Sequence, residues 1–368
     1  MSGDDVSTEL SEHASARIEH LSRLLASGEV RKVLLEPLIL REPVPDLLAR
    51  RRRLFVEWNV APEPFGYTVE FARDLKPTAY TPNGSRAAGR FDVLEASDQV
   101  CLLASTLGAR EQEHGPHLLA RSAYPLGVRP FIKSGELLRS VMRLASQHDW
   151  TPLCLDAMGY DRETREFRRD MKRQPVPDAF REMSEQGRQT HQVRVHFRGG
   201  ADHYLICLFN RYGRAVVEHG DVVVAATGFV LPTAAESLRQ VGTLSIRRES
   251  TPSRQQLVRL EFPPNTFADP DSVRNLCEAL RQGDGLNVTV IHLNPFLHAQ
   301  VLDYLTGESV QLYVMDDANA SLVPRSRADR GTLQRVVATV FRFFGEADVN
   351  VERMTAFGAG GMDADSGQ

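Results

Sequence analysis

The chain has 368 residues, of which 42% are apolar and 25% are charged, and these fractions exclude a wholly disordered protein. Lys and Arg together number 44 against 48 Asp and Glu, which gives a formal net charge of −4. The chain therefore has no overall positive field that attracts nucleic acid or an anionic membrane, and any basic surface must be local.

The N-terminal part of the chain predicts one helix, three strands and two loops. Apolar residues at helical spacing predict an amphipathic helix over residues 7–27. Three apolar runs then predict strands, namely residues 31–40, 54–60 and 66–75. The turn-rich stretch 76–89 and the Gly- and Pro-containing stretch 108–130 predict loops, and we regard the second as a connector that is a candidate for function.

A more regular pattern begins at Ser134. A helix is expected from there, followed by a hairpin of residues 152–160 and 165–169 and a polar helix over residues 176–190. The clearest alternation of apolar and polar side chains is in residues 192–198, which predict a half-buried strand. Residues 204–209 and 214–218 continue as strands.

Residues 257–293 have the pattern of a strand, a helix and a second strand. Asp269 is a suitable N-cap for the helix, Pro270 suits its first turn, and Gly283 suits its end. Short connections between these elements predict a βαβ unit, which implies a parallel strand pair with a right-handed crossover.

The last part of the chain predicts three strands, a helix beginning near Asp329, and a Gly- and Asp-rich tail. The strands are expected at residues 299–305, 309–315 and 320–324. Residues 192–240 and 299–345 share an order of three strands and a helix, which would fit an internal duplication, although their residues do not visibly repeat.

The predicted fold class is mixed α+β. We expect a strand-rich protein of two units, with one parallel βαβ element near residues 257–293 and antiparallel hairpins elsewhere. The expected organisation is an N-terminal helix (1–30), an N-terminal α+β unit (31–190), a C-terminal α/β unit (191–345) and a flexible tail (346–368).

The cysteines and the apolar runs bear on location. The four cysteines form no CxxC pair, so neither a zinc ribbon nor a dithiol redox centre is indicated, and a reducing compartment is expected. The N-terminus lacks the pattern of a secretory signal, and the longest apolar run, residues 221–232, is too short to span a bilayer. We expect a cytoplasmic protein without membrane contact. Only four of the basic side chains are lysines, a bias that favours a bacterial or archaeal source with a GC-rich genome.

Several signatures of catalysis are absent. The sequence has no GxxxxGK[ST] phosphate loop, no GxGxxG after a strand, no HExxH and no GxSxG. These absences disfavour a P-loop ATPase, a Rossmann dehydrogenase, a zincin and an α/β-hydrolase.

The best catalytic candidates follow the second strand of the expected βαβ unit. There His292 would be a base or metal ligand and Asn294 would orient a substrate or water. His298, Asp303, Asp316 and Asp317 would hold a metal ion. The alternative is that Asn294 ends a strand, that His292 belongs to the core, and that Asp316 and Asp317 form a turn.

The second group of candidates is basic. It comprises the run Arg50, Arg51, Arg52 and Arg53, the residues Arg165, Arg168, Arg169 and Lys172, and the strand residues Arg194, His196 and Arg198. Arginines with a period of two on a sheet face can contact successive phosphates. The alternative is a solvated face with local ion pairs, because acidic residues interleave the second cluster.

The connector 108–130 and the segment after it contribute a third feature. His114 and His117 lie in the connector, and Lys133 stands beside the start of a helix, where it could meet an anion. The alternative is a rigid loop that packs against the body of the protein.

The absence of the catalytic signatures and the presence of basic clusters together favour a non-enzymatic binding protein. We expect a subunit of a larger assembly, with other protein subunits as partners and a local Arg-rich surface for nucleic acid or another anion. The alternatives are a metal-dependent hydrolase or nuclease that uses the His292 group, and a purely structural subunit. The sequence indicates no particular cofactor.

Overall fold

The computed structural model describes residues 10–77, 84–124, 126–161, 164, 166–200, 204–243, 256–293, 297–325 and 330–353. These residues form a mixed α+β protein, which confirms the predicted fold class at that level. The chain divides into two compact units, Met1–Arg239 and Gln240–Gln368, which we call unit 1 and unit 2.

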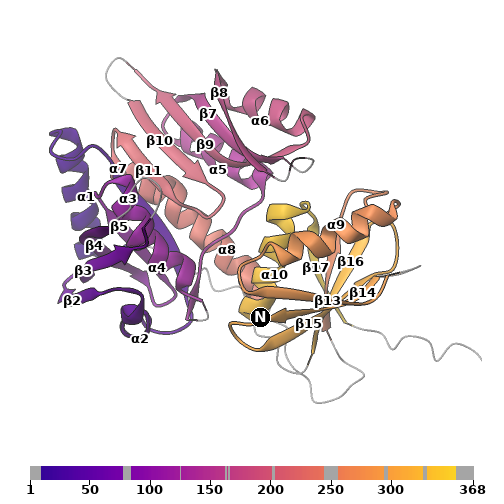
Figure 1. The fold of residues 1–368 in the computed structure, drawn as a ribbon. Coiled ribbons are helices and arrows are strands. Elements are labelled where there is room, and N and C mark those ends of the chain that lie inside the picture. Colours follow the sequence, from indigo (N-terminus) through magenta and orange to yellow (C-terminus); the bar gives the residue numbers. More distant parts are fainter. Residues whose placement is uncertain are drawn as a thin grey trace, which may run out of the picture. The chain divides into compact units, whose positions relative to one another are not determined.

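Unit 1 is built on one large antiparallel sheet (Figure 1). Its path runs β2-β3-β4-β5-β1-β11-β10-β9-β7-β8, and β6 also pairs with β1. The strands are β1 (Val33–Leu40), β2 (Glu57–Glu63), β3 (Gly66–Leu75), β4 (Ser85–Ser97), β5 (Val100–Ser105), β6 (Gly127–Val128), β7 (Thr151–Asp161), β8 (Glu166–Pro175), β9 (Arg188–Arg198), β10 (Tyr204–Asn210) and β11 (Ala215–His219).

Helices lie on both faces of this sheet, and two apolar clusters mark the two faces. One cluster joins α1, α5, α6 and the helix after β11 to the sheet, and the other joins α2 and α4 to the opposite face of β1, β3, β4 and β5. The helical segments are α1 (Glu12–Ala26), α2 (Val44–Arg51), η1 (Arg52–Leu54), α3 (Ala109–His114), α4 (Pro116–Ser122), α5 (Ser134–Gln147), α6 (Val176–Glu185), α7 (Val222–Ala225), the π-helical turn η2 (Ala226–Val230) and α8 (Leu231–Thr243).

The first helix shows how the sequence pattern leads to packing. Four apolar residues at helical spacing (Ala14, Ile18, Leu21 and Leu25) are buried against the sheet. The Ser11 side chain caps the helix by accepting a hydrogen bond from the Ala14 amide at 3.2 Å. Arg17 then fixes the helix to β4, because its Nε and Nη2 both lie 2.8 Å from Oδ2 of the buried Asp92.

Unit 2 is a six-stranded antiparallel sheet with the order β13-β14-β15-β16-β12-β17. The helices α9 and α10 contact one another; α9 also packs on β13 and α10 on β15. The elements are β12 (Gln256–Glu261), α9 (Pro270–Arg281), β13 (Leu286–His292), β14 (Leu297–Asp303), β15 (Glu308–Val314), β16 (Asn319–Arg325), α10 (Arg330–Phe343) and β17 (Asp348–Arg353).

The parallel βαβ element predicted near residues 257–293 is not found. The strand, helix and strand are present as β12, α9 and β13, and Asp269 caps the helix through the Asp271 amide at 3.0 Å. However, β12 pairs with β16 and β17, and β13 pairs with β14, in each case antiparallel. Three successive hairpin connections from β13 to β16 lead the chain back to β12. Both neighbours of β12 in the sheet are therefore other strands, β16 and β17, so β13 cannot pair with it. The helix α9 connects two strands, β12 and β13, that do not pair.

Unit 2 repeats the topology of residues 33–128 in unit 1. Both segments have the chain order strand, helix, four strands, helix and strand, where α3 and α4 together take the place of α10. The order β2-β3-β4-β5-β1 with β6 beside β1 corresponds strand by strand to β13-β14-β15-β16-β12-β17. This correspondence differs from the shared order that the sequence shows between residues 192–240 and 299–345.

Three further segments bear on the expected organisation. The connector 108–130 contains the short helices α3 and α4, and the expected unit boundary at residues 190 and 191 falls inside β9. Within the tail expected from residue 346, Asp348–Arg353 form β17 on the edge of β12, while residues 354–368 lie outside the described residues.

One described helical stretch, Val222–Arg239, is long and apolar enough to cross a membrane when judged by length and composition alone. More than half of it is buried within the structure, as expected of a core helix, which passes the same test.

Candidate anion-binding site

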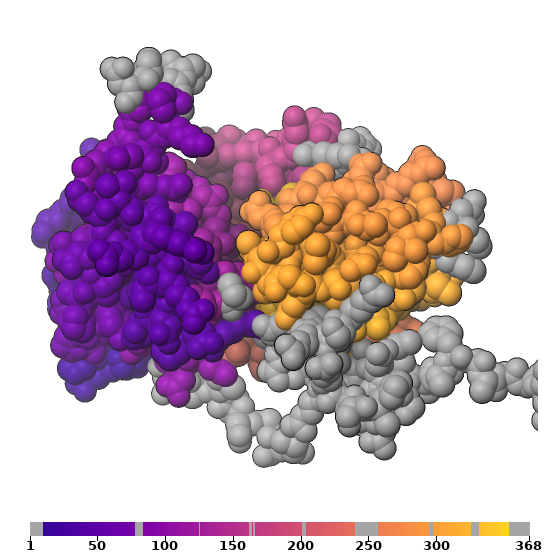
Figure 2. Space-filling model, turned by 60° about the horizontal axis from the view of Figure 1, so that its bottom comes forward, coloured from indigo at the N-terminus to yellow at the C-terminus, as the bar shows by residue number. Residues whose placement is uncertain are grey.

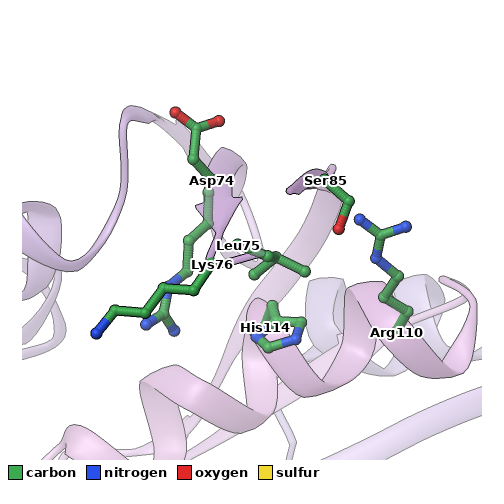
Figure 3. Close-up of a pocket in the computed structure, with 7 residues that line it drawn as sticks. Asp74, Leu75, Lys76, Ser85, Arg110 and His114 are labelled. Carbon is green, nitrogen blue, oxygen red and sulfur yellow. The ribbon is translucent and has the colours of Figure 1, made fainter. Parts of the chain in front are cut away.

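A pocket of about 530 Å³ opens where the β3–β4 hairpin meets α3 (Figure 3). The purple end of this hairpin projects from the rest of unit 1 in the space-filling view (Figure 2). We call the cavity the basic pocket, and its lining residues are Arg73, Asp74, Leu75, Lys76, Ser85, Arg110 and His114. Its volume is within the range typical of small-ligand sites.

The charge of the basic pocket is positive. Three cations (Arg73, Lys76 and Arg110) face one carboxylate, Asp74, which leaves an excess of two positive charges when His114 is neutral. In Figure 3 the Asp74 side chain points away from His114, and His114 and Leu75 lie between Lys76 on one side and Arg110 on the other. Neither Arg73 nor Lys76 forms an ion pair within the part of the chain that the structure describes. Arg110 donates a hydrogen bond to the Arg86 carbonyl at 2.9 Å.

The pKa of His114 depends on burial and on the charged side chains around it. Burial lowers the pKa of His114 below its ordinary value, and the neighbouring charges of Arg73, Arg110 and Arg121 lower it further, while Glu113 raises it. Burial is the largest of these effects, and the arginines act in the same direction.

A buried carboxylate holds α4, the helix that follows α3, against the sheet. Glu36 on β1 is fully buried, and its two carboxylate oxygens accept hydrogen bonds from Nδ1 of His117 at 2.9 and 3.0 Å. The second ring nitrogen of His117 lies 3.8 Å from Glu113, which pairs with Arg121 at 2.7 Å. Glu113 belongs to α3 and Arg121 to α4, so these contacts join both helices to β1 and thereby place Arg110 and His114 at the pocket.

The environment of Glu36 favours its ionised form. Burial by itself raises the pKa of this carboxyl group. The hydrogen bond from His117 and the charges of His117, Arg214 and Arg129 outweigh burial, so the pKa of Glu36 lies below its ordinary value. The Glu36 side chain is therefore a carboxylate at neutral pH.

Two of the predicted basic side chains, Arg169 and Arg194, are neutralised by carboxylates from neighbouring strands. Arg169 makes two hydrogen bonds, of 2.9 and 2.8 Å, to Asp156, which is 1% exposed. Arg194 pairs with Glu218 on β11, and its Nη1 also lies 3.9 Å from Asp156.

The predicted basic cluster that contains Arg169 includes two more paired cations. Lys172 lies 2.9 Å from Glu182 and 3.8 Å from Asp170, and Arg168 lies 3.5 Å from Asp161. Arg165 lies outside the described residues. The paired side chains present little unbalanced positive charge to a polyanion.

His196 and Arg198, in contrast, gather with two aromatic rings at one end of β9, β10 and β11. Arg198 is exposed and stands opposite Tyr204 in the sheet. The Tyr204 ring stacks on His219 with 4.0 Å between ring centroids, and His196 contacts Tyr204 edge-on at 5.8 Å. We call these four residues the Tyr204 cluster.

The run Arg50–Arg53 lies at the end of α2 and in η1. Arg51 is buried and donates hydrogen bonds to the carbonyls of Ala123 and Tyr124 at 3.1 and 2.6 Å, so it caps the end of α4. Burial lowers the pKa of Arg51, and the charges of Arg53 and Arg50 add to that effect. Arg50, Arg52 and Arg53 are exposed.

The residues of the predicted metal site are spread over unit 2. His292 and His298 stand opposite one another on β13 and β14, where His298 contacts Gln311 at 2.5 Å and stacks on Tyr313. Asn294 lies outside the described residues. Asp303 stands at the far end of β14 and is bound by Arg335.

Asp316 and Asp317 lie in the turn before β16. Asp316 accepts hydrogen bonds from the amides of Ala318 and Asn319 at 2.9 and 2.7 Å, as an Asx turn does. No group of three or more His, Cys, Asp or Glu side chains with the spacing of a metal site occurs among the described residues.

The basic pocket was not predicted as a site, although the sequence contained parts of the signal. His114 was singled out within the connector, and residues 76–89 were expected to turn. Lys133, also singled out, begins α5, and its amide donates to Glu136 at 2.9 Å. Arg73 and Arg110 are too far apart in the chain for spacing to show that a hairpin end meets a helix.

Comparison with known proteins adds no assignment, since no protein-family model matches the chain and no curated protein matches it. The functional argument therefore depends on the geometry described above.

We expect Glu36→Gln to remove a buried charge and to lower the free energy of unfolding of the protein at pH 7 by about 3–5 kcal/mol. Because the folded-state pKa of Glu36 is lowered, its ionisation stabilises the fold above pH about 4.5, and this contribution is lost as the pH falls through the folded-state pKa. The stability difference between wild type and variant should thus shrink on acidification.

The measurement is urea unfolding followed by circular dichroism from pH 3 to pH 8. Glu70→Gln, an exposed position on β3, is the control and should change stability by less than about 0.5 kcal/mol. A wild-type to Glu36→Gln difference that stays constant over this pH range would contradict the assignment.

Proposed function

We propose that the chain is a non-enzymatic binding protein whose ligand is an anion held in the basic pocket. The observation that carries the proposal is the excess of positive charge in a cavity of about 530 Å³, where Arg73 and Lys76 have no acidic partner among the described residues and Arg110 binds a backbone carbonyl. Arginine side chains suit this task because they stay protonated and form paired hydrogen bonds with carboxylate or phosphate oxygens.

The proposal also covers where the protein is located and which partners it has. We place it in the cytoplasm as a subunit of a larger assembly, without membrane contact. Support for protein partners comes from Val290, Ile291 and Leu293, which are 36%, 55% and 36% exposed on and just after the edge strand β13. Apolar side chains on an open sheet edge favour association with another chain.

The rival function, a metal-dependent hydrolase that uses His292, Asn294 and His298, has weaker support. Asp303 has Arg335 as its partner, and Asp316 accepts hydrogen bonds from backbone amides, so two of the three carboxylates proposed as metal ligands already have other roles.

To test the pocket, sulfate would be titrated into wild-type protein and into the double variant Arg73→Gln/Arg110→Gln by isothermal calorimetry at low ionic strength. We expect the double variant to bind at least about tenfold more weakly, because each charged hydrogen bond contributes about 1.5–3 kcal/mol.

The matched control is Arg139→Gln, which removes a 70% exposed arginine from α5 in the same unit. This variant should bind sulfate as the wild type does. Equal loss of affinity in the control and the double variant would show that binding follows net charge and not the pocket, and would refute the proposal.

A second candidate is single-stranded nucleic acid at the Tyr204 cluster. The stacked Tyr204 and His219 rings beside the exposed Arg198 favour it, because aromatic rings stack on bases and arginine contacts phosphates. Arg194 is part of an internal ion pair and is not expected to contribute to this surface.

For this candidate we expect Tyr204→Ala to weaken binding of labelled single-stranded DNA or RNA by about tenfold, with Arg198→Ala also weakening it and reducing its salt dependence. Fluorescence anisotropy across a salt series measures both effects. Arg181→Ala, at an exposed arginine on α6, is the control. Unchanged affinity in the Tyr204 and Arg198 variants would remove the cluster as a nucleic-acid site.

A further inference from the structure

The shared topology of the two units allows one corner of each to be compared. In unit 1 the basic pocket lies where the β3–β4 hairpin meets the helix that follows β5. The corresponding corner of unit 2 lies where the β14–β15 hairpin meets α10, the helix that follows β16. The strand pair that closes each hairpin is Leu75 opposite Ser85 in unit 1 and Asp303 opposite Glu308 in unit 2.

Unit 2 supplies its own anions at this corner. Asp303 is fully buried, and both of its carboxylate oxygens lie 2.8 Å from Nη1 of Arg335 on α10. Glu308 accepts a hydrogen bond of 2.5 Å from Thr332, also on α10. In unit 2, therefore, two carboxylates at the hairpin end meet the arginine and hydroxyl that the helix provides.

Unit 1 has cations at this corner but no carboxylate at either of the two positions that close the hairpin. Leu75 and Ser85 stand where Asp303 and Glu308 stand in unit 2, and Arg110 approaches from α3. Arg73 and Lys76 add two charges that the carboxylate of Asp74 only partly offsets. The space next to these cations is the cavity of about 530 Å³.

We propose that the basic pocket binds the dianionic phosphate of a phosphate monoester, in the place that the two carboxylates of Asp303 and Glu308 take in unit 2. This inference rests on the proposed anion-binding function and narrows its ligand. An excess of two positive charges matches a dianion better than a monoanionic diester or carboxylate. The cavity also has room for the organic part of the ester, and Leu75 provides an apolar contact for it.

The same phosphate chemistry occurs in a small phosphorylated metabolite and at the 5′-phosphate end of a nucleic acid. The experiment separates these sources with two probes, namely phenyl phosphate and a short single-stranded oligonucleotide with or without a 5′-phosphate. A site for a free metabolite takes phenyl phosphate and ignores the oligonucleotide phosphate, whereas a site for a strand end binds the 5′-phosphorylated oligonucleotide more tightly than its unphosphorylated form.

The decisive variant is Leu75→Asp, which places in unit 1 the carboxylate that unit 2 has at the same hairpin position. We expect the new carboxylate to occupy the cations and to weaken phenyl phosphate binding at least about tenfold. Leu75→Asn is the matched comparison, because it changes the shape and removes the apolar contact in the same way without adding the charge, and it should bind phenyl phosphate at least about tenfold more tightly than Leu75→Asp. Leu75 is half-buried at a strand end, and circular dichroism and thermal unfolding of both variants verify that the fold is retained.

Calorimetric titration of the wild type with phenyl phosphate, dimethyl phosphate and benzoate completes the test. We expect phenyl phosphate to bind at least about tenfold more tightly than the two monoanions. If all three bind equally, the pocket is a general anion site, so the proposed function stands and this inference fails. If none binds, both fail. Equal phenyl phosphate affinity in Leu75→Asp and Leu75→Asn would also overturn the inference.

Discussion

The buried hydrogen-bonded contact between Glu36 and His117 is the one on which the candidate site depends. A carboxylate with no solvent exposure is stable in a sheet only when donors and positive charges compensate for its lost hydration, and here His117 supplies the hydrogen bonds while Arg214 and Arg129 add charge. Because His117 belongs to α4, the same contact holds the α3–α4 pair on β1. The positions of Arg110 and His114 at the basic pocket follow from it.

The two units share one topology but differ in the charged side chains where the hairpin meets the helix. In unit 2 the hairpin end provides Asp303 and Glu308, so the positive charge from α10 is satisfied inside the protein. In unit 1 the equivalent hairpin end provides Leu75 and Ser85, and the surrounding cations face a cavity. A structural ion pair in one unit thus corresponds to a candidate ligand site in the other. The hairpin end of unit 1 lacks the two carboxylates and adds the cations Arg73 and Lys76.

Several elements of the fold followed from local patterns, whereas the strand pairing did not. The helix α2 was not predicted, and the stretches predicted as loops contain the start of β4 and the helices α3 and α4. The helical spacing of Ala14, Ile18, Leu21 and Leu25 predicted α1, and the alternation from Val193 to Phe197 predicted the core-facing side of β9. The strand, helix and strand of residues 257–293 are also present. Their parallel pairing was wrong because β16 returns to β12 after a meander, and no local pattern specifies which strand becomes the neighbour.

The distribution of charge along the sequence did not predict the candidate site, because the sequence does not show which charged side chains the fold brings together. Arg169 and Arg194 read as a basic face when their own strands are considered, but Asp156 and Glu218 come from other strands and neutralise them. The basic pocket is the reverse case, because Arg73 and Arg110 are isolated in the sequence and come together only through the fold.

A crystal structure of the protein grown with phenyl phosphate tests the central claim most directly. The account predicts a phosphate group between Arg73 and Arg110, and an empty pocket with the phosphate bound at the Tyr204 cluster would contradict it.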